Sequence, residues 1–136
     1  MQVLTNSEEE TQDLAKKLLE EYPEHRVWLL EGDLAAGKTQ LVKGLAKALG
    51  IEKAVSSPTY AYLNEYSSKL AHYDLYRLEG QDEELMHLID EHLASTGHVV
   101  IEWPSRMNVQ VAQAHLFIRI NHEGGSKRSL EITARP

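Results

Sequence analysis

Apolar residues recur at intervals of three and four along three stretches of the chain, which is the spacing of an amphipathic helix. These stretches cover residues 7–22, 38–49 and 82–95. Ser7 opens the first stretch, and the acid three residues later gives it the form of a capping box. Gly50 follows the second stretch, at a position where glycine commonly ends a helix. The pattern therefore predicts three helices, each with one face turned toward a core.

Short apolar runs outside these helices predict strands. Residues 26–31 and 98–103 are almost continuously apolar, as in a parallel strand that is buried on both faces. Residues 2–5 form a shorter strand candidate at the beginning of the chain. A strand, a helix and a second buried strand in this order favour a sheet that is at least partly parallel.

Two further pairs of runs alternate between polar and apolar residues and are separated by turn residues, which is typical of hairpins. The first pair, residues 57–66 and 69–78, is rich in tyrosine and is joined near Ser67. The second pair, residues 115–122 and 129–134, is joined by a segment that contains two glycines. The whole pattern indicates an α/β fold with a mixed parallel and antiparallel sheet flanked by helices.

Length and composition are those of one ordinary globular unit. The chain has 136 residues, 42% of them hydrophobic, so we expect a single domain over residues 1–136 with one packed core. No apolar run is long enough to cross a bilayer, and the first residues lack the plan of a signal peptide. The chain contains no cysteine, which excludes disulfides and thiolate metal sites. Together these features predict a cytoplasmic protein without membrane contact.

The charge of the chain bears on its partners. The formal net charge is −7, and the Lys and Arg residues are scattered rather than clustered. A protein that binds nucleic acid by itself normally presents a basic face. We therefore expect no DNA binding and, if the protein serves a nucleic-acid process, a protein partner that holds the nucleic acid. The acidic surface is also explained by solubility alone.

One motif carries specific chemistry. Residues 32–39 read Gly-Asp-Leu-Ala-Ala-Gly-Lys-Thr, which matches the spacing G-x-x-x-x-G-K-[ST] of a phosphate-binding loop. Such a loop aims backbone N–H groups and the positive end of a helix at phosphate oxygens. Lys38 would supply a charge for the outer phosphates, and the Thr39 hydroxyl would ligate Mg²⁺. The alternative is a plain strand-to-helix turn with a solvated lysine, but the motif follows an apolar strand and opens an amphipathic helix, which favours nucleotide binding.

Two acids are candidates to complete such a site. Glu102 directly follows three apolar residues of a predicted buried strand, at the carboxyl end where ligands of α/β proteins bind. Asp74 lies among tyrosines in the run 69–78, where it fits either simple surface alternation or a site residue. Spacing alone leaves these two interpretations of Asp74 open.

Four segments together resemble the TsaE family of small bacterial P-loop ATPases, which take part in making threonylcarbamoyladenosine in tRNA. They are "EGDLAAGKTQLVKGLAKALGI", "VSSPTYAYLNEY", "HYDLYRL" and "VVIEWP". The resemblance covers nearly the whole chain. It implies a P-loop NTPase-like fold, ATP as substrate, Mg²⁺ as cofactor, and partner proteins of the TsaD and TsaB type, with tRNA contacted only indirectly through them.

The resemblance also assigns roles to residues. It gives Lys38, Asp74 and Glu102 to ATP hydrolysis, and Thr39, Asp74 and Glu102 to Mg²⁺. It places Thr59 near the metal or the γ-phosphate and Trp103 beside the site. Nucleotide contacts are expected from Gly32, Asp33, Leu34, Ala35, Ala36, Gly37, Lys38, Thr39, Gln40, Thr11 and Arg128.

The phosphate loop departs from the usual family pattern at two positions. Ala35 stands where the family usually has glycine, and Gln40 stands where Thr or Ser is usual. If the backbone needs a positive φ at Ala35, alanine would cost about 1 kcal/mol or more. The departure bears on nucleotide affinity rather than on the family.

Two other functions fit a phosphate loop. A small-molecule kinase would need an acceptor pocket and an Arg-bearing helical lid, for which 136 residues leave little room. A nucleotide-responsive scaffold would bind ATP or ADP and recruit partners without needing to cleave. His72, His87 and His92 do not have the spacing of a zinc site, so we interpret them as surface or packing residues.

Overall fold

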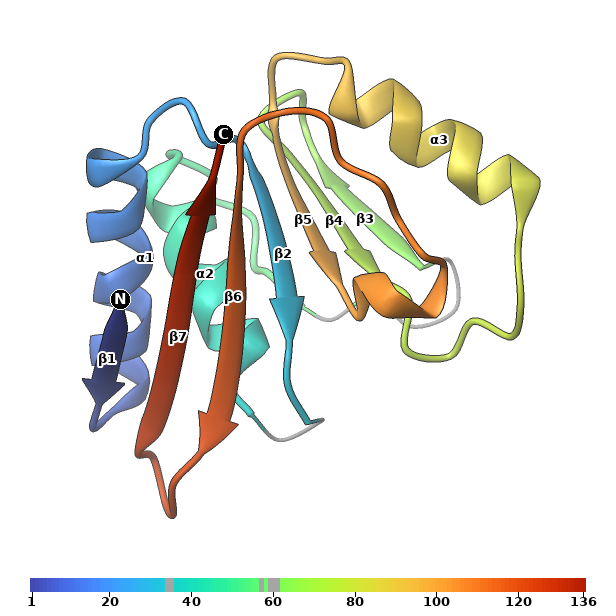
Figure 1. Ribbon diagram of the computed structural model, residues 1–136. Coiled ribbons are helices and arrows are strands. Elements are labelled where there is room, and N and C mark those ends of the chain that lie inside the picture. Colours follow the sequence, from blue (N-terminus) through green and yellow to red (C-terminus); the bar gives the residue numbers. More distant parts are fainter. Residues whose placement is uncertain (34–35, 57, 59–61) are drawn as a thin grey trace.

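The computed structural model describes residues 1–33, 36–56, 58 and 62–136. It forms one seven-stranded sheet with helices on both faces (Figure 1). The elements follow one another as β1 (Gln2–Thr5), α1 (Glu8–Glu21), β2 (Val27–Glu31), α2 (Lys38–Ala48), β3 (Leu63–Tyr66), β4 (Leu70–Asp74), α3 (Glu83–Leu93), β5 (His98–Glu102), the 3₁₀ turn η1 (Pro104–Arg106), β6 (His115–His122) and β7 (Arg128–Arg135).

The strand order in the sheet is β1-β7-β6-β2-β5-β4-β3. The four central strands are parallel, because β2 pairs with both β5 and β6, and β4 pairs with β5, in parallel register. β3 is antiparallel to β4, and β7 is antiparallel to both β6 and β1. The predicted α/β class, the mixed sheet and both hairpins are therefore confirmed. In the described part of the chain, no helix is long and apolar enough to cross a membrane.

The boundaries of two predicted strands were wrong. The run 57–66 was expected to be extended, but β3 begins at Leu63, and neither Pro58 nor Tyr62 belongs to a strand. Residues 69–78 were expected to be extended, but β4 ends at Asp74. The Asp74 carboxylate accepts a hydrogen bond of 3.0 Å from the Tyr76 N–H, and the Leu78 N–H donates to the Leu75 carbonyl at 3.0 Å. An Asp that binds the backbone two residues on forms a turn, so the strand stops at the carboxylate itself. The 3₁₀ turn η1 was not predicted either.

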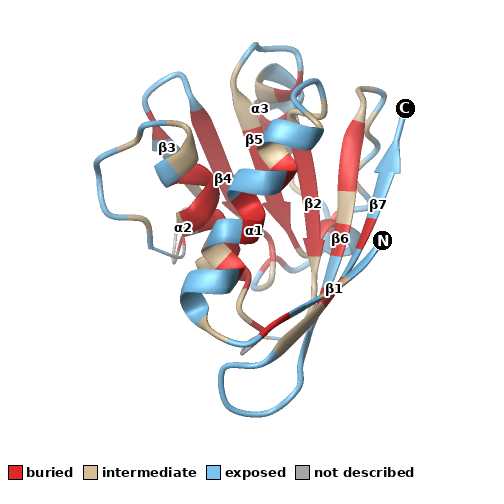
Figure 2. Ribbon diagram, turned by 90° about the vertical axis from the view of Figure 1, so that its left-hand side faces the viewer, coloured by how far each residue is buried: buried red, intermediate tan, exposed pale blue. Residues whose placement is uncertain are grey.

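The helices divide the core into two layers. α1 and α2 pack on one face of the sheet, where Leu14, Leu18 and Leu45 meet Trp28. α3 covers the other face, where its apolar side chains meet Tyr73 and other residues of β2, β4 and β5. Figure 2 shows buried residues concentrated on the central strands and on the inner sides of the helices. Burial on both faces explains why β2 and β5 read as continuous apolar runs in the sequence.

The helix starts agree with their capping signals. The Ser7 hydroxyl accepts from the Glu10 N–H at 3.1 Å, as the capping box requires. The Glu10 carboxylate, however, accepts from the Asn6 N–H at 3.4 Å rather than from Ser7. α3 begins in the same way, with the Asp82 carboxylate accepting from the Leu85 N–H at 3.0 Å.

The packing of α1 against α2 depends on Gly44. A Cβ atom at this position would lie 2.6 Å from the Cα of Gln12, a separation that real Cβ atoms do not show. We expect Gly44→Ala to lower the free energy of unfolding by about 1 kcal/mol or more, because overpacking costs about 1–3 kcal/mol and outweighs the roughly 1 kcal/mol that alanine gains over glycine in a helix. Urea unfolding would measure the change, with the exposed Lys47→Ala on the same helix as the control. An unfolding midpoint equal to or above that of the wild type would contradict this packing.

Candidate functional site

The candidate phosphate loop connects the end of β2 to the start of α2. Gly37 caps α2 in the left-handed conformation, with φ of 100° and ψ of 17°. A Cβ at Gly37 would lie 3.0 Å from the Arg128 Nε, so both its conformation and its space favour glycine. Asp33 is exposed and Ala36 is buried. The first turn of α2 carries no acidic residue and no side-chain cap, which leaves its positive dipole end available to an anion.

Leu34, Ala35 and Thr59 lie outside the described residues. The question of how the backbone accommodates Ala35 therefore stays a prediction, and so does the assignment of Thr59.

Lys38 is the first residue of α2, and its ammonium is buried, with 4% of the residue exposed. Its Nζ donates a hydrogen bond of 2.6 Å to the Gly32 carbonyl and lies 4.0 Å from the Glu102 Oε1. It also lies 4.2 Å from the centre of the Trp103 ring. Burial lowers the pKa of the Lys38 ammonium, while the charges of Glu102 and Asp74 act in the opposite direction. The lysine predicted to bind phosphates is thus held inside the protein by a carbonyl, a carboxylate and an aromatic face.

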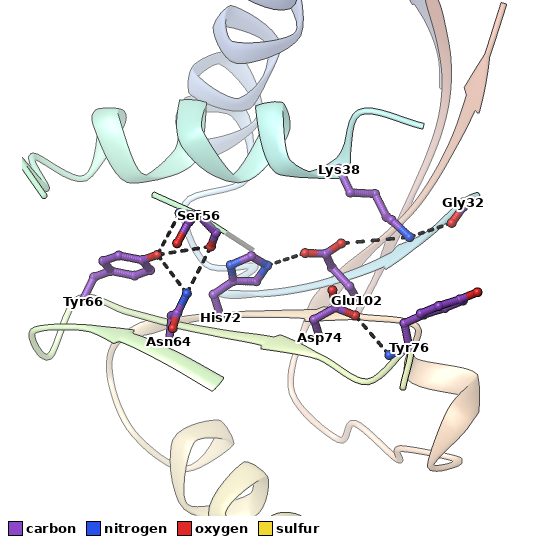
Figure 3. Close-up of polar contacts among 9 residues, drawn as sticks. All are labelled: Gly32, Lys38, Ser56, Asn64, Tyr66, His72, Asp74, Tyr76 and Glu102. Carbon is purple, nitrogen blue, oxygen red and sulfur yellow. Dashed lines mark hydrogen bonds and ion pairs between the residues drawn. The ribbon is translucent and has the colours of Figure 1, made fainter. Parts of the chain in front are cut away.

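The two predicted acids come together. Asp74 ends β4 and Glu102 ends β5, and the two residues are register partners in the parallel pairing of these strands. Glu102 is 2% exposed and Asp74 is partly buried. Burial raises the pKa of the Asp74 carboxyl, and the negative charge of Glu102 raises it further. Figure 3 shows both carboxylates at the same end of the strands, with Lys38 reaching toward Glu102 from α2. The structure thus brings Asp74 beside Glu102, and the role of Asp74 as a site residue stays a prediction.

His72 joins this cluster, which the sequence interpretation missed. It is fully buried, and its Nε2 contacts the Glu102 Oε2. His72 precedes Asp74 by two residues on β4, so both side chains lie on the same face of the sheet. The spacing of two residues between His72 and Asp74 was the available signal in the sequence. It points to the site only once β4 is known to lie beside β5. By contrast, His87 is exposed, and His92 contacts Tyr73 and Glu65 away from the loop.

Aromatic and cationic groups border the same end of the sheet. Trp103 has a left-handed backbone, with φ of 59°, and its ring lies 5.0 Å from that of Tyr76. The Arg106 guanidinium lies 5.3 Å from the centre of the Tyr76 ring and 5.6 Å from that of Trp103. Trp103 therefore lies beside Lys38, and Arg106 is an exposed cation that spacing did not indicate.

Arg128 lies next to the loop, and its expected contact with a nucleotide stays a prediction. Its guanidinium donates to the carbonyls of Gly125 and Lys127, at 2.8 and 2.9 Å. Its Nε is buried and has no hydrogen-bond partner in the described part of the chain. Because this nitrogen is beside Gly37, an N–H donor is left at the edge of the phosphate loop.

Thr11 and Gln40 are engaged within the protein. The Thr11 hydroxyl is buried, shares a hydrogen bond of 2.8 Å with the Thr5 hydroxyl, and donates to the Ser7 carbonyl at 3.2 Å. The Gln40 side chain accepts from the Gln12 side chain at 2.8 Å. Contacts of these two residues with a nucleotide stay predictions.

The donor set suits Mg²⁺. No group of three or more His, Asp and Glu side chains suited to a metal occurs among the described residues, so a protein-only metal cage is not formed there. Two carboxylates, Asp74 and Glu102, lie beside a loop with a hydroxyl at Thr39. Mg²⁺ typically binds to one or two carboxylates and completes its shell with substrate phosphates and water. The residues present therefore fit a magnesium ion that arrives with a nucleotide.

A parallel α/β core with G-x-x-x-x-G-K-T after a central strand defines a P-loop protein. The family model described as "Threonylcarbamoyl adenosine biosynthesis protein TsaE" matches residues 5–130, and the chain belongs to the TsaE family.

Known proteins support this membership along most of the chain. The tRNA threonylcarbamoyladenosine biosynthesis protein TsaE of Bacillus subtilis is 38% identical over 133 residues, which cover 96% of this chain and 83% of that protein. The protein of the same name from Aquifex aeolicus is 40% identical over 110 residues, which cover 77% of each chain. The crystal structure of Bacillus subtilis YdiB matches with a TM-score of 0.77 and 33% identity, covering 98% of this chain and 84% of that chain.

The raised pKa of the Asp74 carboxyl has a consequence for stability. A carboxyl whose pKa is higher in the folded state stabilises the fold fully below its unfolded pKa of about 4, and that contribution is lost as the pH rises through the folded value. We therefore expect Asp74→Asn to unfold at a higher urea concentration than the wild type at pH 7. The difference should shrink as the pH falls below about 4, because Asp74 is then neutral in both states.

Asn can still accept the Tyr76 N–H, so this exchange removes the charge and keeps the turn. The exposed Asp90→Asn on α3 serves as the control. If Asp74→Asn is less stable than the wild type at pH 7, the claim that burying the Asp74 charge destabilises the fold is wrong.

Proposed function

We propose that this protein binds ATP at the loop 32–39 and hydrolyses it with Mg²⁺, in support of threonylcarbamoyladenosine formation in tRNA. The observation that carries the proposal is the meeting of Lys38, Glu102 and Asp74 at the amino end of α2. Membership of the TsaE family supplies the biosynthetic context. The names of the relatives refer to the same modification of tRNA.

The triphosphate is expected to bind at the start of α2, where the positive end of the helix dipole and the Lys38 ammonium both attract phosphate oxygens. Lys38 would exchange the Gly32 carbonyl for phosphate oxygens, since both are acceptors for the same ammonium. A water molecule then attacks the γ-phosphorus in line, the bond to the β–γ bridging oxygen breaks, and ADP leaves. The lysine neutralises the negative charge that builds up on the phosphate oxygens, and this kind of stabilisation is commonly the largest catalytic term.

The carboxylates have complementary tasks in this scheme. Thr39, Asp74 and Glu102 would hold Mg²⁺, which supplies positive charge for the β- and γ-phosphate oxygens. Glu102 and Asp74 also orient the attacking water. Because burial and the charge of Glu102 raise the pKa of the Asp74 carboxyl, Asp74 is a better acceptor than an ordinary Asp for the proton that the attacking water loses. Turnover by the protein alone is expected to be slow, because in this scheme a partner completes the site with an arginine.

The proposed partners are TsaD and TsaB, and tRNA is contacted only through them. The net charge of −7 supports this division of labour, because an acidic protein lacks the basic face that tRNA binding alone would need. ATP hydrolysis would then reset the assembly, while TsaD performs the transfer to tRNA.

The two rival functions differ in what must happen to the γ-phosphate. A kinase would transfer it to a metabolite, but β5 leads into η1 and then β6, with no helical lid in that described stretch. A nucleotide-responsive scaffold would keep its effect on tRNA modification after Glu102→Ala, provided that nucleotide binding survives. Loss of tRNA modification in that variant supports an ATPase.

The proposed roles of Lys38 and Thr39 predict that variants at these positions lose nucleotide binding. Lys38→Ala and Thr39→Ala should each abolish productive binding of Mg·ATP, because they remove the phosphate cation and the metal hydroxyl. Isothermal titration calorimetry measures the affinity, with Lys47→Ala on the exposed side of α2 as the control. Unchanged ATP affinity in both variants would rule out this loop as the phosphate site.

The proposed roles of Asp74 and Glu102 predict that variants at these positions hydrolyse ATP more slowly. Asp74→Ala and Glu102→Ala should each slow phosphate release by about two orders of magnitude, the usual scale for losing one charge-stabilising group. The measurement is steady-state phosphate release with TsaD and TsaB present. Glu131→Ala, an exposed acid on β7, is the control. Wild-type rates in either site variant would remove that residue from the mechanism.

A further inference from the structure

We propose that His72 is a positioning residue, which holds one oxygen of Glu102 so that the other faces Lys38 and the phosphate loop. The inference rests on the proposed function, because it concerns the orientation of a carboxylate assigned to Mg²⁺ and water. It assigns a task to a residue that the mechanism above does not use.

The geometry around Glu102 divides its two oxygens. The His72 Nε2 contacts the Oε2, while the Lys38 Nζ lies 4.0 Å from the Oε1. All three residues are buried, with exposures of 0% for His72, 2% for Glu102 and 4% for Lys38. Figure 3 shows the imidazole on one side of the carboxylate and the ammonium on the other. One oxygen is therefore fixed by β4, which leaves the other directed toward α2.

The two carboxylates of the site are held by different means. Asp74 has a short side chain, and the Tyr76 N–H fixes its oxygen at 3.0 Å. Glu102 has a longer side chain with an additional rotatable bond, so it loses more conformational freedom when it is oriented. A buried donor on the neighbouring strand supplies that orientation before any ligand arrives, as outer-shell partners of metal-binding carboxylates commonly do.

The second ring nitrogen of His72 argues against a purely structural role. The Nδ1 is buried without a hydrogen-bond partner in the described part of the chain. Buried polar atoms are nearly always paired, and an unpaired one is costly. A histidine kept there for packing alone would be improved by an apolar residue of similar size. The contact between the His72 Nε2 and Glu102 is the feature that such a replacement would remove.

The test compares His72→Leu with His72→Gln. Leucine fills the space without a donor, whereas the amide nitrogen of glutamine takes the place of Nε2. The first readout is the affinity for ADP by isothermal titration calorimetry, with and without Mg²⁺. We expect affinity without Mg²⁺ to stay within about twofold of wild type in both variants. The gain in affinity on adding Mg²⁺ should fall by about tenfold or more in His72→Leu and be largely retained in His72→Gln.

The second readout asks whether His72 acts through Glu102. In a Glu102→Ala background, His72→Leu should cause no further loss of the Mg²⁺-dependent gain or of phosphate release. His72→Asn replaces the leucine variant if leucine prevents folding. The Asn side chain is shorter, so its amide occupies the position of the His72 Nδ1 and does not reach Glu102. Thermal melts confirm that each variant is folded.

Three outcomes overturn the proposal. They are a full Mg²⁺-dependent gain in His72→Leu, equal losses in the leucine and glutamine variants, and additive losses in the Glu102→Ala background. In each of these cases, ATP hydrolysis by the wild-type protein would still support the proposed function. A wild type with no Mg²⁺-dependent nucleotide binding would overturn both.

Discussion

A single buried ammonium organises the functional end of this molecule. Lys38 lies at the first turn of α2, yet its Nζ reaches back to the Gly32 carbonyl and across to Glu102 on β5. Burying a positive charge is unfavourable, and the lowered pKa of the Lys38 ammonium reflects that cost. The fold tolerates it because a carbonyl, a carboxylate and the Trp103 ring surround it. In the proposed function, the triphosphate would offer the Lys38 ammonium stronger partners than the Gly32 carbonyl, so the cost of burying this charge would favour binding.

The sheet topology brings the acidic residues of the candidate site together. β5 inserts between β2 and β4, so residues far apart in the chain end side by side: Leu30 pairs with Glu102, and Glu102 with Asp74. This is the carboxyl edge at which open α/β sheets bind ligands. The chain crosses from β5 to the far side of β2 to form β6, and the hairpin that follows carries Arg128 back to the loop at Gly37.

Local patterns were sufficient to predict most elements of the fold. Helical spacing and the Ser7 cap placed α1, and continuous apolar runs placed β2 and β5. Lys38 and Glu102 could be singled out because their signals are local, a motif in one case and a strand end in the other. Asp74 needed the family resemblance as well, and the register of β4 with β5 provides its physical reason.

What the sequence did not predict depends on contacts between distant residues. His72 gains meaning only from its contact with Glu102, thirty positions away. Arg128 was indicated by the family resemblance alone, because the final hairpin is what brings it to Gly37. The early end of β4 follows from a side-chain hydrogen bond that propensity does not include.

The most direct measurement is a crystal structure with Mg²⁺ and a non-hydrolysable ATP analogue. The account predicts that the Lys38 Nζ leaves the Gly32 carbonyl for the β- and γ-phosphates, with Asp74 and Glu102 directed at the metal. An analogue bound elsewhere, with Lys38 still on the Gly32 carbonyl, would contradict it.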